Sequence, residues 1–542
     1  MAEITGGEAV VRTLIAHGVD VVFGLIGVHA LPIYDALSKH PELRHISVRH
    51  EQSAAYLADG YSRASGRPGA CITTTGPGAA NTAAAMGTAY SDSVPILNIT
   101  TQIPSDLVDK GKGFLHEAKD QLGLFRALTK WNARVDRILE IPSVIHEAFL
   151  AMTEGRPRPT HVEICADTLA AVADEQDISW VSSGLPEDRP GVDLDKVAEA
   201  ARMLAAARAP VIWAGGGVIR SGAAEELVRL AETLQAPVVT TVQGSGAIPY
   251  DHPLALGYRP AQAAVSTLLA KSDLLLAVGT RFPATQTSTW ALTLPKRLIH
   301  VDIDEGEIGK NYPAALDLVG DARAVLSQLL DSMPPLSRAS CWAGKVSAIR
   351  AKIAAEMKSN APAEMGLLEV IRGAIDRDAV VVCDQTKPAY WASGAFPVFA
   401  PRTFLYPGYG TLGFGFPAAL GAKIAAPDCQ VICLCGDGGF QYALPELATA
   451  AQFGVNVTVL LFNDSAYGIL KDMQDGAYGG RHYAVDLINP DFPRLVESYG
   501  LRCQSLDGQE GLEGALKDAL AADRTTVVEI DASVARPPQG VH

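Results

Sequence analysis

The chain has 542 residues, of which 48% are hydrophobic and 19% are charged, and its formal net charge is −15. A chain of this length is too long for one hydrophobic core, so we expect about two to four domains. The acidic balance argues against a nucleic-acid partner, because such a partner requires a basic surface that displaces counterions.

The eight cysteines are dispersed from Cys71 to Cys503 and show no paired spacing. This pattern is typical of a reduced, cytoplasmic protein rather than of a disulfide framework. The stretch MAEITGGEAVVRTLIAHGVD has no basic segment followed by an apolar core. No run of about 18 apolar residues occurs, so we expect neither a signal peptide nor a membrane partner.

Short apolar runs alternate with Ala-rich helical segments along the chain. In chain order the main runs are VVFGLIG (21–27), ACITTTGPG (70–78), PVIWAGGG (210–217), LLLAVGTRF (274–282), LIHVDID (298–304), AVVVCD (379–384), QVICLCGDG (430–438) and VTVLLFND (457–464). Runs that are apolar on both faces and alternate with helices predict an α/β fold with mostly parallel sheets flanked by helices. Many runs end in Gly or Asp, where ligands bind beyond the carboxyl ends of parallel strands.

The runs divide into three segments, which we expect to be three domains. They span residues 1–180, 190–335 and 360–535, and a link rich in Asp, Glu, Pro and Gly follows the first. The first and third segments are similar in size and style. They therefore suggest two copies of one architecture, an interpretation that the sequence alone does not test.

Two acidic residues follow two successive apolar runs of the third segment. Asp437 lies between glycines after the first run, and Asp464 follows the second run 27 positions later. That spacing fits one βαβ crossover, so both carboxylates are expected at neighbouring strand ends, where they could hold Mg²⁺ through oxygen ligands. The alternative is that Asp437 caps a turn and Asp464 caps a helix.

The pattern of GDG, about 27 residues and Asn463-Asp464 resembles the thiamine-diphosphate-binding motif. The resemblance implies that Asp437, Asp464 and the Ala466 carbonyl bind the Mg²⁺ that holds the diphosphate, with Asn463 as the alternative second ligand. Further residues of this cofactor site implied by the resemblance are Thr386, Gly436, Gly438, Gly439, Tyr467, Gly468 and Ile469.

The stretch SVRHEQSAAYLADGYSRASGRPGACITTTGPGAAN (47–81) resembles the pyrimidine-binding domain of the same family. There a strand-end glutamate bonds to the aminopyrimidine of the cofactor and activates it, which implies that Glu51 is the catalytic glutamate. Without this resemblance, Glu51 would be interpreted as an ordinary residue in the first turn of a helix, where the helix dipole favours a carboxylate. The resemblance also places Pro77 and Asn81 at the cofactor.

The stretch YPGYGTLGFGFPAALGAKIAAP (406–427) resembles the segment that bends the cofactor into its V shape. It implies that Leu412 is the supporting aliphatic residue and that the Gly410 carbonyl receives the 4′-amino group. The three segments then become a pyrimidine-binding, a middle Rossmann-like and a diphosphate-binding domain. In this family Glu51 and Asp437 serve one site from two chains, which implies at least a homodimer and commonly a homotetramer.

The whole chain resembles the acetolactate synthase, benzoylformate decarboxylase and benzaldehyde lyase-like superfamily, with departures from acetolactate synthase. Those enzymes usually carry Phe-Gln-Glu where this chain has Leu115-His116-Glu117. A family lysine falls at Ala166, and a tryptophan that selects the second keto acid falls at Met473. The middle stretch GTRFPATQTSTW (279–290) departs from the family's FAD segment, which argues against FAD.

The resemblance implies chemistry at a carbon–carbon bond next to a carbonyl, through a C2 ylide and an enamine. We expect a 2-keto acid decarboxylase or carboligase, with acetolactate synthase proper and 2-hydroxyacyl-CoA lyase as alternatives. Either His29, in a loop where benzaldehyde lyase carries a histidine, or His116, as in guanidino-keto-acid decarboxylases, could move the proton. A loop hydrogen bond is the alternative for each histidine.

Gln121, Met473 and Arg481 are candidate substrate contacts, the last within QDGAYGGRHYAVDLINPDF (474–492), a stretch suited to a mobile flap. Two other classes of protein are less favoured for this chain. A catalytically inactive relative would lack Glu51 or the metal acids. A nicotinamide dehydrogenase is suggested by AGGGVIR near Gly215, but no acid follows at the spacing that a ribose requires.

Overall fold

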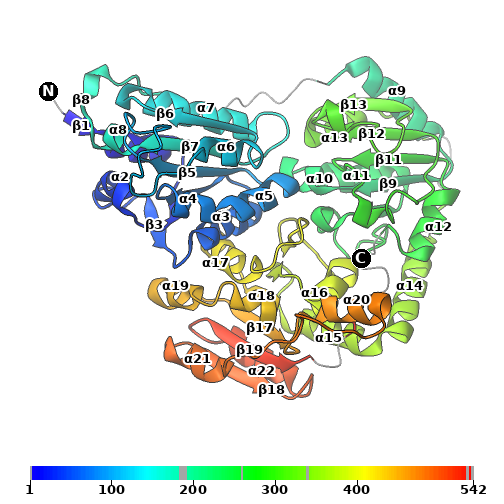
Figure 1. Cartoon of the computed structure of the whole chain (residues 1–542). Helices are drawn as coiled ribbons and strands as arrows, with labels where there is room; N and C mark the ends of the chain where they lie inside the picture. Colours follow the sequence, from blue (N-terminus) through cyan, green and yellow to red (C-terminus); the bar gives the residue numbers. More distant parts are fainter. Residues whose placement is uncertain are drawn as a thin grey trace. The chain divides into compact units, whose positions relative to one another are not determined.

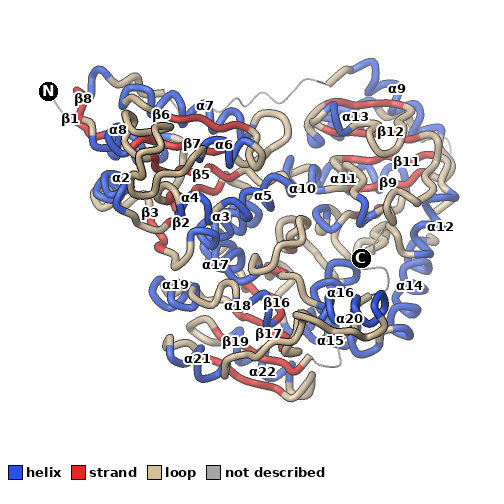
Figure 2. The backbone as a smooth tube through the Cα atoms, viewed as in Figure 1, coloured by secondary structure: helices blue, strands red, loops and turns tan. Residues whose placement is uncertain are grey.

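The computed structural model describes residues 3–181, 192–257, 260–336, 341–342, 344–532 and 536–538. The predicted domain boundaries at residues 190 and 535 lie outside the described residues. Three sheets of mostly parallel strands are flanked by helices, which confirms the predicted α/β fold with three sheet domains (Figures 1 and 2).

The chain divides into two compact units. The first comprises Met1–Leu185, Val381–Thr386 and Pro407–Ser533, and the second comprises Pro186–Val380, Lys387–Tyr406 and Val534–His542. Helices α15 (Pro362–Ala374) and α16 (Lys387–Ala395) group with the second unit. The predicted start of the third domain at residue 360 therefore falls inside that unit.

The N-terminal sheet is parallel throughout, in the order β3-β2-β4-β5-β7-β6. Its strands are β2 (Val21–Gly24), β3 (Arg44–Ser47), β4 (Gly69–Thr73), β5 (Ile96–Gln102), β6 (Trp131–Val135) and β7 (Thr160–Cys165). Its helices are α1 (Gly6–Ala16), α2 (Leu31–Leu37), α3 (Glu51–Ser65), α4 (Pro77–Asn81), α5 (Ala83–Asp92), α6 (Gln121–Arg126), α7 (Ile141–Thr153) and α8 (Ala166–Ala170). A separate antiparallel pair joins β1 (Glu3–Thr5) to β8 (Val172–Asp174).

The C-terminal sheet has the order β15-β14-β16-β17-β19-β18. Its strands are β14 (Val380–Cys383), β15 (Phe404–Leu405), β16 (Val431–Gly436), β17 (Thr458–Asn463), β18 (Arg502–Leu506) and β19 (Thr526–Asp531). The helices of this region are α17 (Gly415–Ala425), α18 (Asp437–Gln441), α19 (Glu446–Phe453), α20 (Gly468–Tyr478), α21 (Phe492–Ser498) and α22 (Leu512–Leu520).

The N- and C-terminal sheets share one strand order. Numbered from the first strand of each sheet along the chain, both orders read 2-1-3-4-6-5. The first and third strands are neighbours, and the connections leave them in opposite directions, which opens a crevice beyond their carboxyl ends. The two sheets thus support the interpretation that the first and third segments repeat one architecture.

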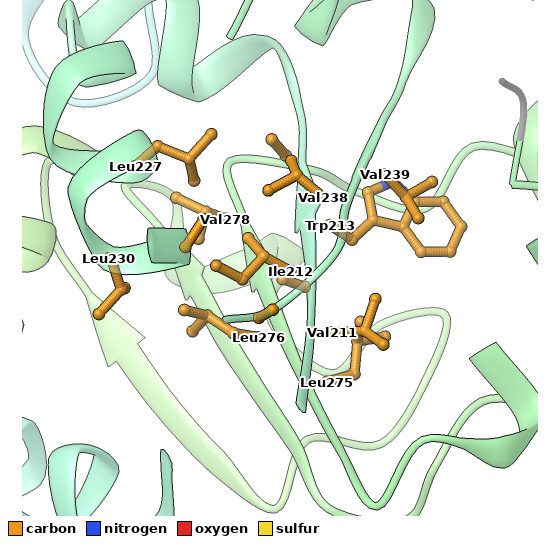
Figure 3. Packing of buried hydrophobic residues seen from close by; sticks show 14 of the residues in the cluster. Val211, Ile212, Trp213, Leu227, Leu230, Val238, Val239, Leu275, Leu276 and Val278 are labelled. Atoms are coloured by element: carbon orange, nitrogen blue, oxygen red, sulfur yellow. The ribbon is translucent and has the colours of Figure 1, made fainter. Parts of the chain in front are cut away.

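The middle domain is built on a parallel sheet of order β10-β9-β11-β12-β13. Its strands are β9 (Pro210–Ala214), β10 (Val238–Thr240), β11 (Leu274–Val278), β12 (Leu298–Asp302) and β13 (Leu316–Val319). Helices of this unit are α9 (Leu194–Ala206), α10 (Gly216–Ser221), α11 (Ala224–Leu234), α12 (Ala263–Lys271), α13 (Ala322–Ser332) and α14 (Val346–Asn360). Apolar side chains of β9, β10 and β11 interlock with Leu227 and Leu230 of α11 in its core (Figure 3).

Within the first unit, helix α3 packs closely against helix α17 (Figure 1). A Cβ added to Gly60 of α3 would lie 2.0 Å from the Ala418 carbonyl oxygen. A Cβ added to Gly421 of α17 would lie 1.9 Å from the Leu57 carbonyl oxygen. Only glycine permits this approach of two helix backbones, because each obstructing atom is itself backbone.

Replacement of Gly421 by Ala should therefore destabilise the first unit, because the added methyl group forces the two helices apart. We expect a loss of about 1–3 kcal/mol of unfolding free energy, as is usual for overpacking. Gly514 of α22 is the matched control, since a Cβ there meets nothing within 4 Å. Thermal melting of G421A and G514A beside the wild type makes the comparison. Equal melting temperatures for G421A and the wild type would contradict the proposed close contact.

Candidate active site

Two clusters of predicted site residues lie at the crevices of the N- and C-terminal sheets. The Glu51 cluster comprises His29, Glu51, Gly76, Gly78, Asn81 and His116. The Asp437 cluster comprises Asp437, Asn463, Asp464, Ala466 and Asn489. Both clusters belong to the first compact unit, and each follows the carboxyl ends of its own strands.

Glu51 is the first residue of α3, where the helix dipole favours a carboxylate. Its Oε2 accepts a hydrogen bond from Asn81 Nδ2 at 2.9 Å. A Cβ on Gly78 would lie 3.3 Å from Glu51 Oε1, so the glycine leaves that oxygen accessible. Helix α4 begins at Pro77 and ends at Asn81, which brings the three predicted residues of this domain together.

His29 and His116 face each other across this crevice. Their ring centroids are 5.3 Å apart, and His29 is only 7% exposed. Among the described residues, neither ring Nδ1 has a hydrogen-bond partner. Burial lowers the pKa of His29, and the neighbouring His116 lowers that pKa further. A neutral imidazole at this position can accept a proton at neutral pH.

The loop that carries His116 is fixed by its contact with Gly76. His116 has a left-handed backbone with φ of +67°, and Gly76 has φ of +63°. A Cβ on Gly76 would lie 2.5 Å from the His116 carbonyl oxygen. The glycine in GPG is thus required by the close approach of the histidine loop as well as by its own backbone angle.

Gln121 does not face the crevice as a free amide. It is 2% exposed, and its Oε1 accepts hydrogen bonds from the Gly76 N–H at 2.8 Å and from Thr75 Oγ1 at 2.9 Å. Its Nε2 donates to the Thr101 carbonyl at 2.9 Å and to Glu163 Oε2 at 3.0 Å. The protein therefore occupies both ends of the amide. Gln121 thus fixes the GPG loop, and its contact with a substrate stays a prediction.

Asp437 follows β16 directly and is 1% exposed. Asn489 Nδ2 donates hydrogen bonds to Asp437 Oδ2 at 2.7 Å and to Asn463 Oδ1 at 2.8 Å. Asn489 is in turn oriented by Gln441 Nε2, which donates to its Oδ1 at 2.7 Å. This network holds one carboxylate oxygen of Asp437 and fixes the direction of the other.

The strand register places Asn463, rather than Asp464, beside Asp437. Gly436 of β16 pairs with Phe462 of β17, so the next residues, Asp437 and Asn463, are level. The Asn463 amide is already used by the protein, since its Nδ2 donates to Glu529 Oε1 at 2.8 Å. Asn463 thus belongs to the orienting network, and Asp464 follows it in the loop beyond the strand.

The loop after Asp464 is clamped by the returning end of the predicted flap. The Tyr467 N–H donates to the Val485 carbonyl at 2.7 Å, and the Leu487 N–H donates to the Ser465 carbonyl at 2.8 Å. Ala466 forms an antiparallel bridge with Asp486 between these two bonds. The flap and the loop that presents the Ala466 carbonyl therefore move as one hydrogen-bonded piece.

Met473 lies in α20, which begins at Gly468-Ile469 and has no buried residue. Arg481 is exposed in the turn that follows. Side-chain contacts join the helix to this returning segment, namely an ion pair of Lys471 with Asp486 at 2.7 Å and a hydrogen bond between His482 Nε2 and Asp475 Oδ1 at 2.7 Å. Both predicted substrate residues are thus carried by the same exposed element.

Asp384 links three glycine-rich turns of the C-terminal domain. It is 1% exposed and follows β14, and it accepts the N–H of Gly413 at 3.2 Å and of Gly415 at 2.7 Å. A Cβ on Gly439 would lie 2.9 Å from its Oδ1. Burial raises the pKa of Asp384, and backbone N–H groups oppose that rise. The carboxylate therefore sets the position of the Leu412 loop relative to GDGG.

The loop of Gly410 and Leu412 is also held from the N-terminal domain. Asp92 Oδ2 accepts the Gly408 N–H at 2.9 Å and Arg63 Nη2 at 2.9 Å. Gly410 has φ of +81°, and no atom lies within 4 Å of a Cβ built on it. The glycine is thus required by the backbone angle rather than by a neighbour.

The remaining predicted cofactor residues pack around GDGG. A Cβ on Gly436 would lie 3.2 Å from Thr386 Oγ1, and a Cβ on Gly438 would lie 2.7 Å from the Tyr467 ring. Thr386 and Tyr467 therefore border the two sides of the Asp437 turn. Glycine at both positions leaves room for these two side chains beside the turn.

Neither a metal cage nor a membrane helix is found in the part of the chain that the structure describes. No group of three or more His, Cys, Asp or Glu side chains there could hold a metal ion. A metal at Asp437 would therefore need carbonyl, ligand or water oxygens as well. Among these same residues, no helix has the length and apolar character needed to cross a bilayer.

The glycines of AGGGVIR are explained by packing in the middle domain. A Cβ on Gly215 would lie 2.1 Å from the Gly279 carbonyl oxygen, and a Cβ on Gly217 would lie 2.6 Å from Gly279 Cα. The turn after β9 therefore abuts the turn after β11. This close contact accounts for the glycine run without a nucleotide.

Sequence reasoning missed several residues that organise the two clusters. Asp384 had a usable signal, since it ends an apolar run as Asp437 does. Asn489 had no such signal in the sequence, because only the folded path of the flap brings it within hydrogen-bond distance of Asp437. The same holds for Gln441, which orients Asn489.

Three family models match the chain in order. They are described as thiamine pyrophosphate enzyme, N-terminal TPP binding domain (residues 4–124), central domain (residues 197–329) and C-terminal TPP binding domain (residues 384–530). The matched ranges contain the Glu51 cluster, the middle sheet and the Asp437 cluster, respectively.

Whole-chain relatives carry two kinds of name. A probable acetolactate synthase large subunit of Methanocaldococcus jannaschii is 38% identical and covers 97% of this chain and 91% of its own length. A probable 2-ketoarginine decarboxylase of Pseudomonas aeruginosa is 40% identical and covers 98% of this chain and 95% of its own. Acetolactate synthase isozyme 3 large subunit of Escherichia coli is 35% identical, with 98% and 95% covered.

Proposed function

The chain belongs to the thiamine pyrophosphate enzyme family, and from that membership we propose that it is a 2-keto acid decarboxylase or carboligase. The observation that carries the proposal is the Glu51 carboxylate, which is held by Asn81 and left open by Gly78 at the start of α3. Such a carboxylate can share a proton with a ring nitrogen.

The residues present fit thiamine diphosphate with Mg²⁺. Asp437 and Asp464 supply hard oxygen ligands, and the Ala466 carbonyl is presented by a clamped loop. When bound, the cofactor supplies the electron sink for breaking or forming a bond next to a carbonyl. Glu51 would hold the proton at its aminopyrimidine, and Leu412 and the Gly410 carbonyl would support the ring.

A decarboxylase of a cationic or other 2-keto acid is the first candidate for the reaction. One relative of the chain is named a 2-ketoarginine decarboxylase. This chain also has a single histidine, His116, at the position where acetolactate synthases carry Gln. Acetolactate synthase is the second candidate, because other relatives carry that name. A 2-hydroxyacyl-CoA lyase remains a further alternative.

The assay incubates the protein with thiamine diphosphate, Mg²⁺ and a panel of 2-keto acids that includes pyruvate and 5-guanidino-2-oxopentanoate. We expect carbon dioxide release that stops when a chelator removes the metal. Glu51→Gln should lower kcat by about 10²- to 10⁴-fold, the usual range for losing acid–base catalysis. Glu369→Gln is the control, since Glu369 forms an exposed ion pair with Lys358. Full activity in E51Q would refute the assignment.

The two histidines of the Glu51 cluster are the groups best placed to move a proton at the substrate. His29→Ala or His116→Ala should lower kcat by about 10²-fold or more for the histidine that acts. His252→Ala in the middle domain is the control, because His252 pairs with Glu232. Since burial lowers the pKa of His29, the acid limb of the kcat/KM profile should lie below the ordinary histidine value of about 6.5. Unchanged kcat in both variants would remove the histidines from the mechanism.

We propose further that the working site joins the Glu51 cluster of one chain to the Asp437 cluster of another. Large apolar side chains are exposed around both clusters, which is typical of surfaces that pair. Those beside His29 are Ile26, Val28, Leu31, Phe114 and Leu115, and those around the flap are Tyr442, Leu470, Tyr478, Tyr483 and Ile488. A homodimer would cover both surfaces, and pairing of dimers would give a homotetramer.

Mixing two inactive variants tests this arrangement. In a dimer of one Glu51→Gln chain and one Asp437→Asn chain, one site carries both changes and the other is intact. After subunit exchange we expect roughly a quarter of wild-type activity, since half of the dimers are mixed and each has one intact site. A site confined to one chain gives no recovery. Mixing E51Q with itself is the control.

A cytoplasmic location is also proposed. The eight cysteines are free, and five of them are buried. Free thiols persist in a reducing compartment. Recovery of the native protein in the membrane or secreted fraction of its own cells would contradict this location.

A further inference from the structure

Glu446 is a fully buried carboxylate outside both clusters. It is the first residue of α19 and is 0% exposed. A buried carboxylate is costly unless hydrogen bonds replace its water. The hydrogen-bond partners of Glu446 therefore indicate the role of its side chain.

The carboxylate reaches from the C-terminal domain to the backbone of the N-terminal domain. Glu446 Oε1 accepts the N–H of Arg49 at 3.1 Å and the N–H of His50 at 3.1 Å. Its Oε2 accepts Thr449 Oγ1 at 2.5 Å, which fixes the carboxylate from its own helix. Two consecutive peptide groups of one domain are thus bound by one side chain of the other.

These two peptide groups lie where the chain leaves the sheet and starts α3. Strand β3 ends at Ser47, and the Val48 N–H still donates to the Gly24 carbonyl at 3.0 Å. His50 is the N-cap of α3 and Glu51 is its first residue. Glu446 therefore supplies the acceptor for the peptide groups that precede Glu51, at a helix start that favours a negative charge.

We propose that Glu446 is a positioning residue that holds the Arg49–His50 backbone so that Glu51 meets the cofactor in the orientation needed for proton transfer. The proposal rests on the proposed function. An error of about 1 Å in such a group costs on the order of 10²-fold in rate, so a fixed start of α3 matters for chemistry as well as for folding.

The position of Glu446 in the chain also bears on how two active sites are connected. It lies nine residues after Asp437 in the chain, on the helix that follows the GDGG turn. If each site combines two chains, Glu446 joins the Asp437 cluster of one site to the Glu51 cluster of the other. The Glu446 carboxylate is then one of the contacts that link the diphosphate domain of one site to the catalytic glutamate of the next.

The test compares Glu446→Gln with the wild type in three measurements. The first is the rate at which the C2 proton of bound thiamine diphosphate exchanges with deuterium, followed by NMR after acid quenching. The second is the Kd for thiamine diphosphate with Mg²⁺, and the third is the melting temperature. The amide of E446Q removes the negative charge and puts an NH2 group in place of one oxygen, and that group cannot accept from the Thr449 hydroxyl or the Arg49 N–H as Oε2 does.

We expect C2 exchange in E446Q to slow by about 10- to 100-fold, while the Kd changes by less than about 3-fold. The matched control is Asp273→Asn in the middle domain. Asp273 also accepts two consecutive backbone N–H groups, those of Arg208 at 2.8 Å and Ala209 at 2.9 Å. D273N should lower the melting temperature as E446Q does, and leave C2 exchange unchanged.

Wild-type exchange in a folded E446Q overturns the positioning role. If E446Q does not fold, Thr449→Val replaces it, since that change removes the hydroxyl that fixes the carboxylate from its own helix and keeps its charge. Slowed exchange in T449V supports the proposal, and exchange at the wild-type rate overturns it. Failure of the wild type itself to exchange C2 faster than E51Q would instead refute the proposed function, so the two failures are distinguishable.

Discussion

The close crossing of helices α3 and α17 is the constraint on which the first compact unit depends. Gly60 and Gly421 each face a backbone carbonyl oxygen of the other helix, at distances that exclude any side chain. The helix that begins with Glu51 is therefore held against the helix that follows the Leu412 loop. Two carboxylates join the same two domains elsewhere, since Glu446 accepts the Arg49 and His50 N–H groups and Asp92 accepts the Gly408 N–H. The N- and C-terminal domains of one chain are thus joined by helix packing and by hydrogen bonds within the first compact unit.

The two clusters have one origin in the shared strand order of their sheets. In each sheet the first and third strands are neighbours, and the loops beyond them leave in opposite directions. In the N-terminal sheet these loops carry His29 and Gly76, and in the C-terminal sheet they carry Asp384 and Asp437. One architecture therefore carries both clusters, and the difference between them lies in the side chains at the crevice.

Hydrogen bonding within the protein separates the residues that face a ligand from those that support them. Gln121 and Asn463 both lie beside a cluster, yet their amides are engaged by the protein. The Nδ1 atoms of His29 and His116 lack such partners among the described residues. The amides of Gln121 and Asn463 therefore act as scaffold, whereas the histidines are open to the proton-transfer role proposed for them.

The sequence by itself determined the α/β class, the three sheets and the family, because apolar runs, terminal glycines and acids are local signals. It also led to the prediction of Glu51 and Asp437 as site residues, since each has its neighbours in motif order along the chain. Only the tertiary structure decided that Gln121 supports the GPG loop, that Asn489 orients Asp437, and that Glu446 holds the backbone before Glu51. Those contacts join residues from 45 to 397 positions apart. No local pattern encodes them, because hydrogen-bond partners at such separations are chosen by the packing of domains.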